Sequence, residues 1–454
     1  MKAITRRSFV GGASAAVVAG LAACGNAGSG SSESKDRAPE DRKGNVYWLN
    51  FKPELDETAQ ALGKKYMEKF PNVTVKVVTA ASGTYKQTLT SEMDKSDAPT
   101  LFVIGNQDGV KEWGDYAMDL KDTDLVKAQN TDEYNLKDGD KVVAAGYCYE
   151  CYGICVNDDL VKKAGHSTDD IKDFESLKAV VEDIHKNAAT LGFDAFVATD
   201  LDDSSSWRVT GHLANLEYYY EEKDAGDAWT KAPATIKGTY LPNYKNLFDL
   251  AVNNSTVEPN TLATGGHDPA TEFASGKAAF MFSGSFGYAD LGGAVENTSC
   301  IPYYCGVQGE EKAGLNCGTE NCWAVNDNAS DEDKQATLDF ALWLVSDPEA
   351  AKSMVAELGV LPFNDAPEGD NPYLNDAVSY QKDGCYTMDW ATNYQPNVNE
   401  YRAALVSALN AYTADMSDAN WEPVKTAFVD GWASARVPHV SRGWVGSRAR
   451  SAPL

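Results

Sequence analysis

Cysteine, tyrosine and glutamate side chains gather in one short run of the chain. Residues 146–157 read GYCYECYGICVN, with three cysteines, three tyrosines and one glutamate. Cys148 and Cys151 form a C-x-x-C pair, and Cys155 follows four positions later. Thiols in such a pattern can bind zinc, exchange disulfides or fill a hydrophobic core. The surrounding sequence indicates which of these three roles the thiols have.

The spacing argues against a metal or redox centre. Side chains alternate along a strand, so Cys151 and Cys155 share one face and Cys148 takes the other. A zinc site needs four converging ligands, no histidine lies near the run, and a redox C-x-x-C pair begins a helix. We therefore expect no metal, no cofactor and no redox catalysis here. Buried thiols are expected instead, either as small hydrophobic residues or paired with a later cysteine: Cys300, Cys305, Cys317 or Cys322.

The N-terminus carries the signals of an exported lipoprotein. Residues 5–9 read TRRSF, a twin-arginine motif, and the apolar run after them is too short and glycine-rich for a transmembrane helix. That run ends in LAAC, which is typical of a lipobox and predicts lipidation of Cys24. We predict a signal peptide at 1–23 and a flexible tether at 24–43. The domain would then be lipid-anchored at the extracellular face of the cytoplasmic membrane.

Length and charge narrow the class of protein further. The chain has 454 residues, too many for a single core, so two lobes are expected. It carries 67 acidic and 40 basic residues, a formal net charge of −27, which repels nucleic acid. The last stretch, 435–454, breaks this pattern because it holds four arginines and no acid. We expect it to be a disordered or non-native tail, with a basic tail that binds a partner as the alternative.

Hydrophobic periodicity predicts alternating strands and helices. Residues 46–49 and 73–77 are typical of strands, and the apolar positions after Pro53 follow a helical period up to Phe70. A second helix is expected at 85–93, before an apolar run at 100–104. This β-α-β-α-β order favours an α/β fold with mixed sheets flanked by helices.

Several segments, taken in order, resemble the extracellular solute-binding proteins of sugar ABC importers, the family that includes maltose-binding protein. The strand at 98–105 resembles the family's P-D-hydrophobic motif, with Thr100 in place of the usual Asp. Residues 149–160 are similar to Y-x-x-x-Y-N-K-x-L, and 341–350 to F-x-x-W-L-x-S-x-E. Residues 273–286 resemble F-x-x-G-K-A-A-M-x-x-N-G-x-W, the most specific match, although Phe stands where the family has its last Trp.

The resemblance covers roughly 44–434 and implies a periplasmic-binding-protein-like fold of two α/β lobes with a ligand cleft between them. It implies a first lobe at 44–149 plus about 317–362, and a second lobe at 150–316 plus about 363–434. Two or three hinge segments would join the lobes. The closed form would dock on the permease subunits of an ABC transporter, and the receptor is expected to be a monomer.

The resemblance also implies which residues bind the ligand. Glu150 would lie where the chain crosses between lobes, and a carboxylate can accept two hydroxyl hydrogen bonds at once. Aromatic rings would cover the C–H face of a sugar while acids and amides bind its rim. The expected ligand-binding residues are Asn50, Phe51, Lys52, Glu54, Asn106, Gln107, Glu150, Trp207, His212, Phe286, Tyr288, Glu320, Asn321, Trp323, Tyr386, Asp389 and Trp390.

We therefore predict a receptor for a sugar or oligosaccharide that has no enzymatic activity. Three alternatives stay open. A binding protein for a non-sugar such as a polyamine would want several acids and few amides in its cleft. An extracellular glycoside hydrolase would need a pair of acids at a defined separation. An adhesin is disfavoured because repeats and a Pro/Thr-rich stalk are missing, and no nucleophile elbow, H-E-x-x-H or P-loop points to other enzymes.

Overall fold

In the computed structural model the first sheet is built by the segments that the sequence marks as strands near the N-terminus. The structure describes residues 38–435, except 82, 203, 227–228 and 230–231. The sheet contains six strands in the order β2-β1-β3-β11-β5-β4. Their bounds are β1 Gly44–Asn50, β2 Val73–Thr79, β3 Leu101–Ile104, β4 Leu136–Asp138, β5 Lys141–Gly146 and β11 Cys322–Val325.

Parallel and antiparallel pairs are mixed in this sheet. β1 pairs in parallel with β2 and β3, as expected when helices connect successive strands. β11 returns from far along the chain and pairs antiparallel with β3 and β5. The predicted strands at 46–49, 73–77 and 100–104 and the helix after Pro53 are confirmed. The helices of this part of the chain are α1 Asp56–Lys69, α2 Tyr85–Met93, α3 Gln107–Trp113, α4 Asp124–Lys127, α10 Asp331–Ser346 and α11 Pro348–Leu358.

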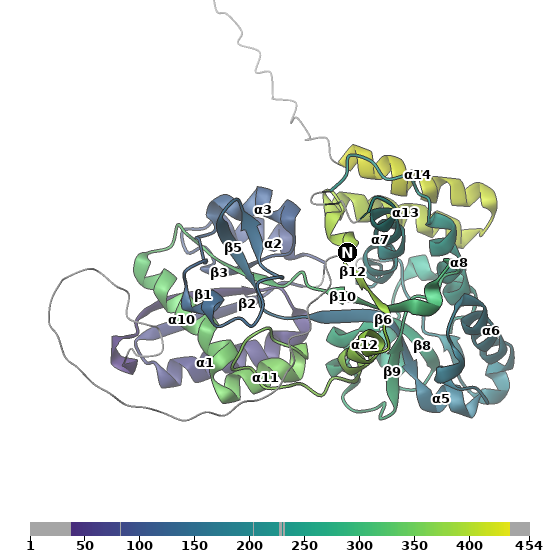
Figure 1. Cartoon of the computed structure of the whole chain (residues 1–454), viewed down its shortest axis with the longest axis horizontal. Coiled ribbons are helices and arrows are strands. Elements are labelled where there is room, and N and C mark those ends of the chain that lie inside the picture. The colour runs from purple at the N-terminus through teal and green to yellow at the C-terminus, as the bar shows by residue number, and fades with distance from the viewer. Residues whose placement is uncertain (1–37, 82, 203, 227–228, 230–231, 436–454) are drawn as a thin grey trace, which may run out of the picture. The chain divides into compact units, whose positions relative to one another are not determined.

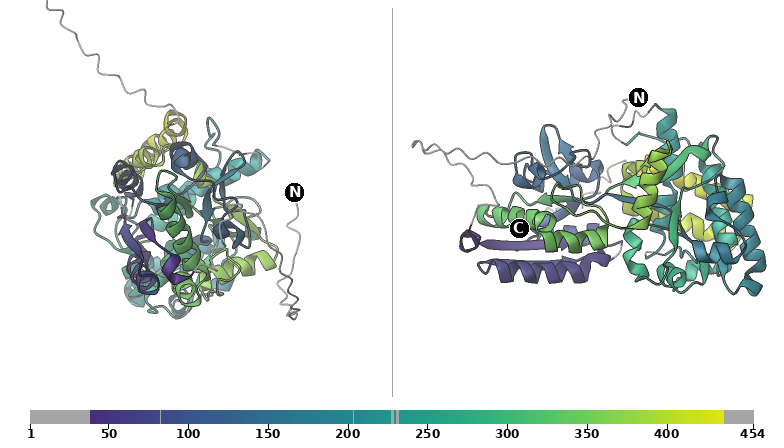
Figure 2. Two further views of the ribbon diagram at one scale, coloured as in Figure 1. Left: turned by 90° about the vertical axis from the view of Figure 1, so that its left-hand side faces the viewer. Right: turned by 60° about the horizontal axis from the view of Figure 1, so that its bottom comes forward.

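Aromatic rings fill the core between this sheet and its helices. Trp48 on β1 meets Trp323 on β11 edge to face, with ring centroids 6.0 Å apart. Phe340 on α10 contacts both Trp48 and Tyr66 of α1, at centroid distances of 5.9 Å and 5.0 Å. Ser330 caps α10 by accepting a hydrogen bond from the Asp333 amide. Figures 1 and 2 show α1, α10 and α11 lying alongside the purple strands β1 and β2.

A second six-stranded sheet follows. Five of its strands lie in the order β12-β10-β6-β8-β7, and the sixth strand, β9, pairs with β6. Its strands are β6 Glu150–Asn157, β7 Asp194–Phe196, β8 Ala278–Gly284, β9 Thr298–Ile301, β10 Ala313–Gly318 and β12 Tyr386–Asp389. β6 is the central strand, and every one of its residues is buried. A strand buried on both faces has no polar alternation, which explains why its cysteines and apolar residues run together.

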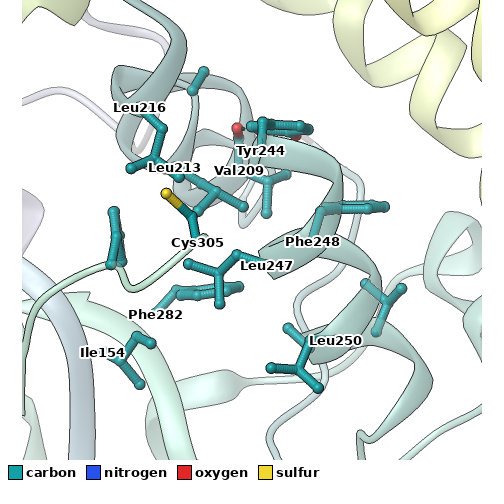
Figure 3. Packing of buried hydrophobic residues seen from close by; sticks show 14 of the residues in the cluster. Ile154, Val209, Leu213, Leu216, Tyr244, Leu247, Phe248, Leu250, Phe282 and Cys305 are labelled. Carbon is teal, nitrogen blue, oxygen red and sulfur yellow. Dashed lines mark hydrogen bonds between the residues drawn. The ribbon is translucent and has the colours of Figure 1, made fainter. Parts of the chain in front are cut away.

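Helices cover this second sheet, as Figure 1 shows for α5, α6, α8 and α12 to α14. Their bounds are α5 Asp158–Lys163, α6 Phe174–Leu191, α7 Asn215–Asp224, α8 Leu241–Asn253, α9 Pro269–Ala274, α12 Pro372–Lys382, α13 Val398–Ala414 and α14 Asp418–Ala435. Figure 3 shows the core from close by, where Leu247 of α8 lies near Phe282 of β8 and Cys305, and Phe248 belongs to the same cluster. These side chains are almost fully buried, so their removal from water stabilises the fold.

The chain passes between the two sheets at short segments. Residues 147–149 connect β5 of the first sheet to β6 of the second, and 319–321 connect β10 of the second to β11 of the first. A third passage follows α11, where Val360 pairs with Tyr149 in an isolated bridge. The mixed α/β architecture with two helix-flanked sheets is the predicted two-lobe fold.

Part of the predicted tether belongs to the folded structure. Pro39–Asp41 form a 3-10 turn, and the Arg42 guanidinium lies 4.6 Å from the centroid of the Phe70 ring. Lys43 pairs with Glu332 of α10. These contacts place 38–43 with the first sheet instead of in a flexible tether. The predicted signal peptide at 1–23, the lipidated Cys24 and the tail after Ala435 lie outside the described residues.

Candidate functional site

A buried polar network lies where the chain first crosses between the sheets. The Lys52 ammonium donates to Glu150 Oε1 at 2.7 Å and to Glu54 Oε1 at 3.0 Å. The Asn321 amide donates to Glu150 Oε2 at 2.7 Å from the returning segment. Glu150 therefore receives one hydrogen bond on each oxygen, one from the loop after β1 and the other from the returning crossing segment. The arrangement holds a carboxylate, a cation and an amide together at the start of β6.

The loop after β1 is shaped to deliver Lys52 to this network. Asn50 is fully buried, and its amide donates to the Lys52 carbonyl at 2.7 Å and to Thr79 Oγ1 at 3.0 Å. Its carbonyl oxygen accepts from the Lys52 backbone amide at 3.1 Å. The side chain of Asn50 thus closes a turn around Lys52. These bonds position Lys52 and use the Asn50 amide within the chain, so we do not include Asn50 in the candidate site.

The opposite charges of Lys52 and its acidic partners determine which groups of the network are ionised. Burial alone would lower the pKa of Lys52, but Glu150 and Glu54 outweigh it and raise that pKa well above its ordinary value. Burial raises the pKa of Glu150, and Lys52 opposes the rise. Lys52 therefore stays protonated at neutral pH. Its charge offsets part of the desolvation cost of the Glu150 carboxylate.

Four rings gather beside the polar network. The His212 imidazole stacks on Tyr152 with centroids 4.0 Å apart and planes 2° from parallel. Trp207 lies edge-on to His212 at 4.9 Å and to Phe286 at 5.7 Å. The Lys52 ammonium lies 5.9 Å from the Phe286 centroid and so connects the ring cluster to the polar network. These rings come from β6, from the π-helical segment Arg208–Leu213 with the residue before it, and from the turn after β8.

Trp390 completes the ring cluster from the other side. Its indole lies 5.0 Å from Tyr152 and 6.1 Å from His212, centroid to centroid. It also covers Gly318, where an added Cβ would come within 2.9 Å of the indole. The Tyr152 hydroxyl and Trp390 Nε1 are buried, and neither has a hydrogen-bond partner among the described residues. Both polar atoms can therefore bond to a group that the chain itself does not supply.

Cations around His212 keep its ring neutral. Burial, with Arg402 and Arg208 close by, lowers the pKa of His212 well below its ordinary value. Arg402 itself donates to the Gln395 side chain at 2.7 Å. A neutral imidazole offers one donor and one acceptor nitrogen at every pH near neutrality. Neither Tyr152 nor Arg402 was expected from sequence, although Tyr152 stands two positions after Glu150 in the same run.

Eight of the expected ligand residues come together in this site. They are Lys52, Glu54, Glu150, Trp207, His212, Phe286, Asn321 and Trp390. Glu320 lies next to them, half-buried; burial is the main cause that raises the pKa of Glu150 and of Tyr152, and the Glu320 charge adds to it. The polar and aromatic parts of the site therefore derive from six separate regions of sequence, around residues 52, 150, 210, 286, 321 and 390.

Other expected residues serve the fold elsewhere. Trp323 is fully buried and stacks on Tyr147 at 4.1 Å, so it belongs to the core of the first sheet and cannot touch a ligand. Tyr288 packs edge-on against Tyr373 at 5.6 Å, in a cluster behind β6. Phe51 packs in the same manner on another tyrosine, at 5.2 Å. These rings gain more from burial than from a solvent-facing position.

Polar residues at strand ends are also used by the fold. Asn106 caps α3 by accepting from the Gly109 amide at 2.8 Å, a usual role of Asn before a helix. Gln107 donates to the Lys137 carbonyl at 2.9 Å. Tyr386 shares a 2.9 Å hydrogen bond with another tyrosine hydroxyl. Asp389 is exposed and accepts from Asn215 through its backbone carbonyl at 3.0 Å. The side chains of Asn106, Gln107 and Tyr386 therefore bond to groups outside the polar network and the ring cluster.

The three cysteines of residues 146–157 lie in two different hydrophobic clusters, as the alternation of side chains along a strand predicts. Cys151 and Cys155 lie in one buried cluster with β9 and β10, whereas Cys148 lies in the core of the first sheet. Within residues 38–435, apart from the few undescribed positions, no three His, Cys, Asp or Glu side chains lie close enough to hold a metal ion. In the same part of the chain, none of the helices has the length and hydropathy needed to cross a bilayer.

Two helix-flanked sheets joined by crossing segments, with a carboxylate and rings at the crossing, define a two-lobe ligand-binding protein. A model of the bacterial extracellular solute-binding proteins matches residues 61–378. The chain belongs to this family.

Solved structures with the same fold are distant in sequence. A raffinose complex of the solute-binding protein RafE is 16% identical, covers 86% of this chain and 100% of its own, and superposes with a TM-score of 0.67. A mannobiose-bound binding protein of an ABC transporter from Bifidobacterium animalis subsp. lactis is 15% identical, with 89% and 98% covered and a TM-score of 0.64. A sugar transporter protein from Bacillus licheniformis, in complex with stachyose, is 16% identical, with 86% and 99% covered and the same TM-score of 0.64.

Proposed function

We propose that the chain is the receptor of an ABC importer and captures a sugar or oligosaccharide at the site around Glu150. The single observation that carries this is the juxtaposition of a hydrogen-bonded carboxylate network with a cluster of rings. A pyranose presents a polar rim and an apolar C–H face, so both halves of the site have a matching surface on the ligand. The similar structures named above were solved with raffinose, mannobiose and stachyose.

Each half of the site would contribute in a different way. The rings of Trp207, Phe286 and Trp390 offer apolar surface to the sugar's C–H face. Hydroxyl groups would bond with the carboxylates and with two buried groups that lack a partner within the described part of the chain, the Tyr152 hydroxyl and Trp390 Nε1. An unpaired buried donor costs free energy in the empty protein, so a ligand that satisfies it gains affinity. Ligand contacts with both sheets would favour the closed arrangement of the lobes.

The network favours a neutral ligand over a polyamine. A cationic ligand would need free carboxylates, but Lys52 already pairs with Glu150 and Glu54. A polyamine would have to displace this buried ammonium before it gained any ion pair. A sugar hydroxyl can add to the carboxylates' unused lone pairs without breaking the ion pair.

The same pairing argues that the site does no chemistry of its own. A nucleophilic carboxylate has to form a covalent bond to the sugar through one of its oxygens, whereas a binding carboxylate only accepts hydrogen bonds. Both oxygens of Glu150 are held, one by Lys52 and the other by Asn321. The proposed role is therefore capture and delivery to the permease subunits. We also propose that Cys24 carries a lipid that retains the monomeric receptor at the extracellular face of the membrane.

Calorimetric titration with mono- and oligosaccharides, and with polyamines in parallel, tests this proposal. We expect micromolar or tighter binding of one sugar family and no cleavage of that sugar by chromatography. Trp390→Ala should weaken binding by about 1–3 kcal/mol, roughly 5- to 150-fold, as expected for a buried aromatic anchor. Glu422→Gln on exposed α14 is the matched control and should bind as the wild type does. Polyamine binding alone, or cleavage of the sugar, would overturn the assignment.

A further inference from the structure

Four cysteines face one another in pairs across neighbouring strands of the second sheet. In the antiparallel register, Cys155 of β6 lies opposite Cys300 of β9. Four residues earlier on β6, Cys151 lies opposite Cys317 of β10. All four side chains are buried in the same hydrophobic cluster. Two such pairs on one strand face raise the question of whether each pair has the geometry of a disulfide.

Hydrogen bonding identifies the kind of pair that Cys155 and Cys300 form. Opposite residues in an antiparallel ladder either exchange both backbone hydrogen bonds or exchange none, and side chains approach more closely in the second kind. The Cys300 amide donates to the Asp376 carboxylate at 2.8 Å, so it does not donate to the Cys155 carbonyl. Cys155 and Cys300 are therefore a non-hydrogen-bonded pair. Its usual Cα separation, about 4.5 Å, falls within the range that disulfides span.

The second pair is of the same kind. The Cys151 amide donates to Ser285 Oγ at 3.1 Å, on the β8 side of β6 and away from β10. It therefore does not reach the Cys317 carbonyl. Cys151 and Cys155 are four residues apart, so their backbone amides point to the same side of the strand. The hydrogen bonds of the Cys300 and Cys151 amides therefore each indicate that the cysteine pair is a non-hydrogen-bonded one.

We propose that Cys151–Cys317 and Cys155–Cys300 are sites of oxidative modification that close as two cross-strand disulfides. The oxidant is an exchangeable disulfide, either a small molecule or a protein. One thiolate attacks it to form a mixed disulfide and releases one thiol. The second cysteine, after losing its proton, displaces the other thiol, so two electrons pass to the oxidant and one S–S bond forms in the chain.

Burial determines when the reaction takes place. Burial raises the pKa of the Cys317 thiol to about 12 and the pKa values of Cys151 and Cys300 well above their ordinary range. The reactive thiolate is therefore scarce in the folded protein, and no oxidant can reach it without local opening. The bonds form while β9 and β10 are still docking onto β6. Once formed, they are protected from reductants for the same reason.

One of the two bonds adjoins the ligand site. The residue pair next to Cys151–Cys317 in the ladder is Glu150 opposite Gly318. Gly318 lies under the Trp390 indole, and Asn321, which binds Glu150, follows three residues later. A bond at this position would link the outgoing and returning crossing segments at the end of the second sheet. Cys155–Cys300 would fix β9, which is otherwise attached along only one strand.

Oxidative refolding of the full chain tests the proposal. The protein is denatured and reduced, refolded with oxidised and reduced glutathione, quenched in acid and alkylated in denaturant. Chymotryptic cleavage after Tyr152 separates Cys151 from Cys155, and tandem mass spectrometry then identifies linked peptides. We expect two links, Cys151–Cys317 and Cys155–Cys300. We also expect the remaining cysteines of the folded part to be alkylated: Cys148, Cys305, Cys322 and Cys385.

Variants separate each bond from general effects on folding. Cys300→Ser should lose the link to Cys155 and keep Cys151–Cys317, and Cys385→Ser, half-exposed and remote from both pairs, should keep both. Wild type refolded under reducing conditions should have a Tm roughly 5 °C or more below that of wild type refolded with the glutathione pair. Full alkylation of all eight cysteines from Cys148 to Cys385 after refolding would overturn the proposal. A different pairing, such as Cys148 with Cys151, would overturn it equally, and neither result depends on a variant folding.

Discussion

Replacing Lys52 with methionine is the sharpest perturbation of the polar network. Methionine keeps the length of the side chain but removes the ammonium that serves two acids. The side chains of Lys52 and Glu150 are only 6% and 3% exposed, so the remaining carboxylate would stay buried with a single donor from Asn321. Removing one partner of a buried ion pair typically costs 3–5 kcal/mol. Because Glu150 keeps that donor and can take up a proton, we expect the lower end, about 3 kcal/mol.

Urea unfolding followed by tryptophan fluorescence measures this loss. The double variant Lys52→Met/Glu150→Gln removes the stranded charge as well, and should recover at least half of the lost stability. Lys65→Met is the matched control, because Lys65 pairs with Glu349 at the surface, where both side chains are exposed; it should cost less than about 1 kcal/mol. A Lys52→Met variant as stable as this control would refute the claim that the network is a desolvated ion pair.

Three further predictions concern other parts of the chain. Burial and a neighbouring acid, Glu221, raise the pKa of Glu217 to about 9. Between pH of about 4.5 and about 9, Glu217 is ionised in the unfolded state but mostly protonated in the folded state, so the wild type should lose stability as pH rises through this range. Glu217→Gln should match the wild type near pH 4 and exceed it at pH 8 in thermal unfolding; parallel curves would contradict this. Leu247→Ala removes a fully buried side chain and should cost about 2–5 kcal/mol in urea unfolding, whereas a loss below 1 kcal/mol would mean the core collapses around the gap. Gly318→Ala should displace the Trp390 indole and weaken sugar binding in calorimetry about 10-fold or more, whereas unchanged affinity would remove Trp390 from the site.

Local patterns predicted the strands and helices near the N-terminus because these depend on neighbours in sequence, whereas the crossing at Glu150 was implied by the family resemblance. The run ECYGICVN is a strand buried on both faces, and its apolar character is visible in one dimension. The helix α14 was not predicted as an element, since Pro423 inside it interrupts the pattern that usually marks a helix.

Ligand residues were harder to predict because burial and partners come from distant segments. Trp323 and Trp390 are both tryptophans in short polar stretches, yet one stacks on Tyr147 in a core and the other faces His212. Asn50 and Asn106 have polar side chains typical of ligand-binding residues, but the hydrogen bonds of these side chains close a turn and cap a helix. Only tertiary contacts distinguish these uses, so residue type at a strand end indicates a region and not a role.

Calorimetric titration of the full chain with a panel of oligosaccharides, with sugar integrity followed by chromatography, tests the central claim most directly. The account predicts saturable binding of one sugar family at micromolar or lower concentration, loss of affinity in Trp390→Ala, and recovery of the sugar intact. Absence of binding to every sugar, together with binding of a polyamine, would contradict the assigned ligand class. Recovery of a cleaved sugar would contradict the claim that the site captures without reacting.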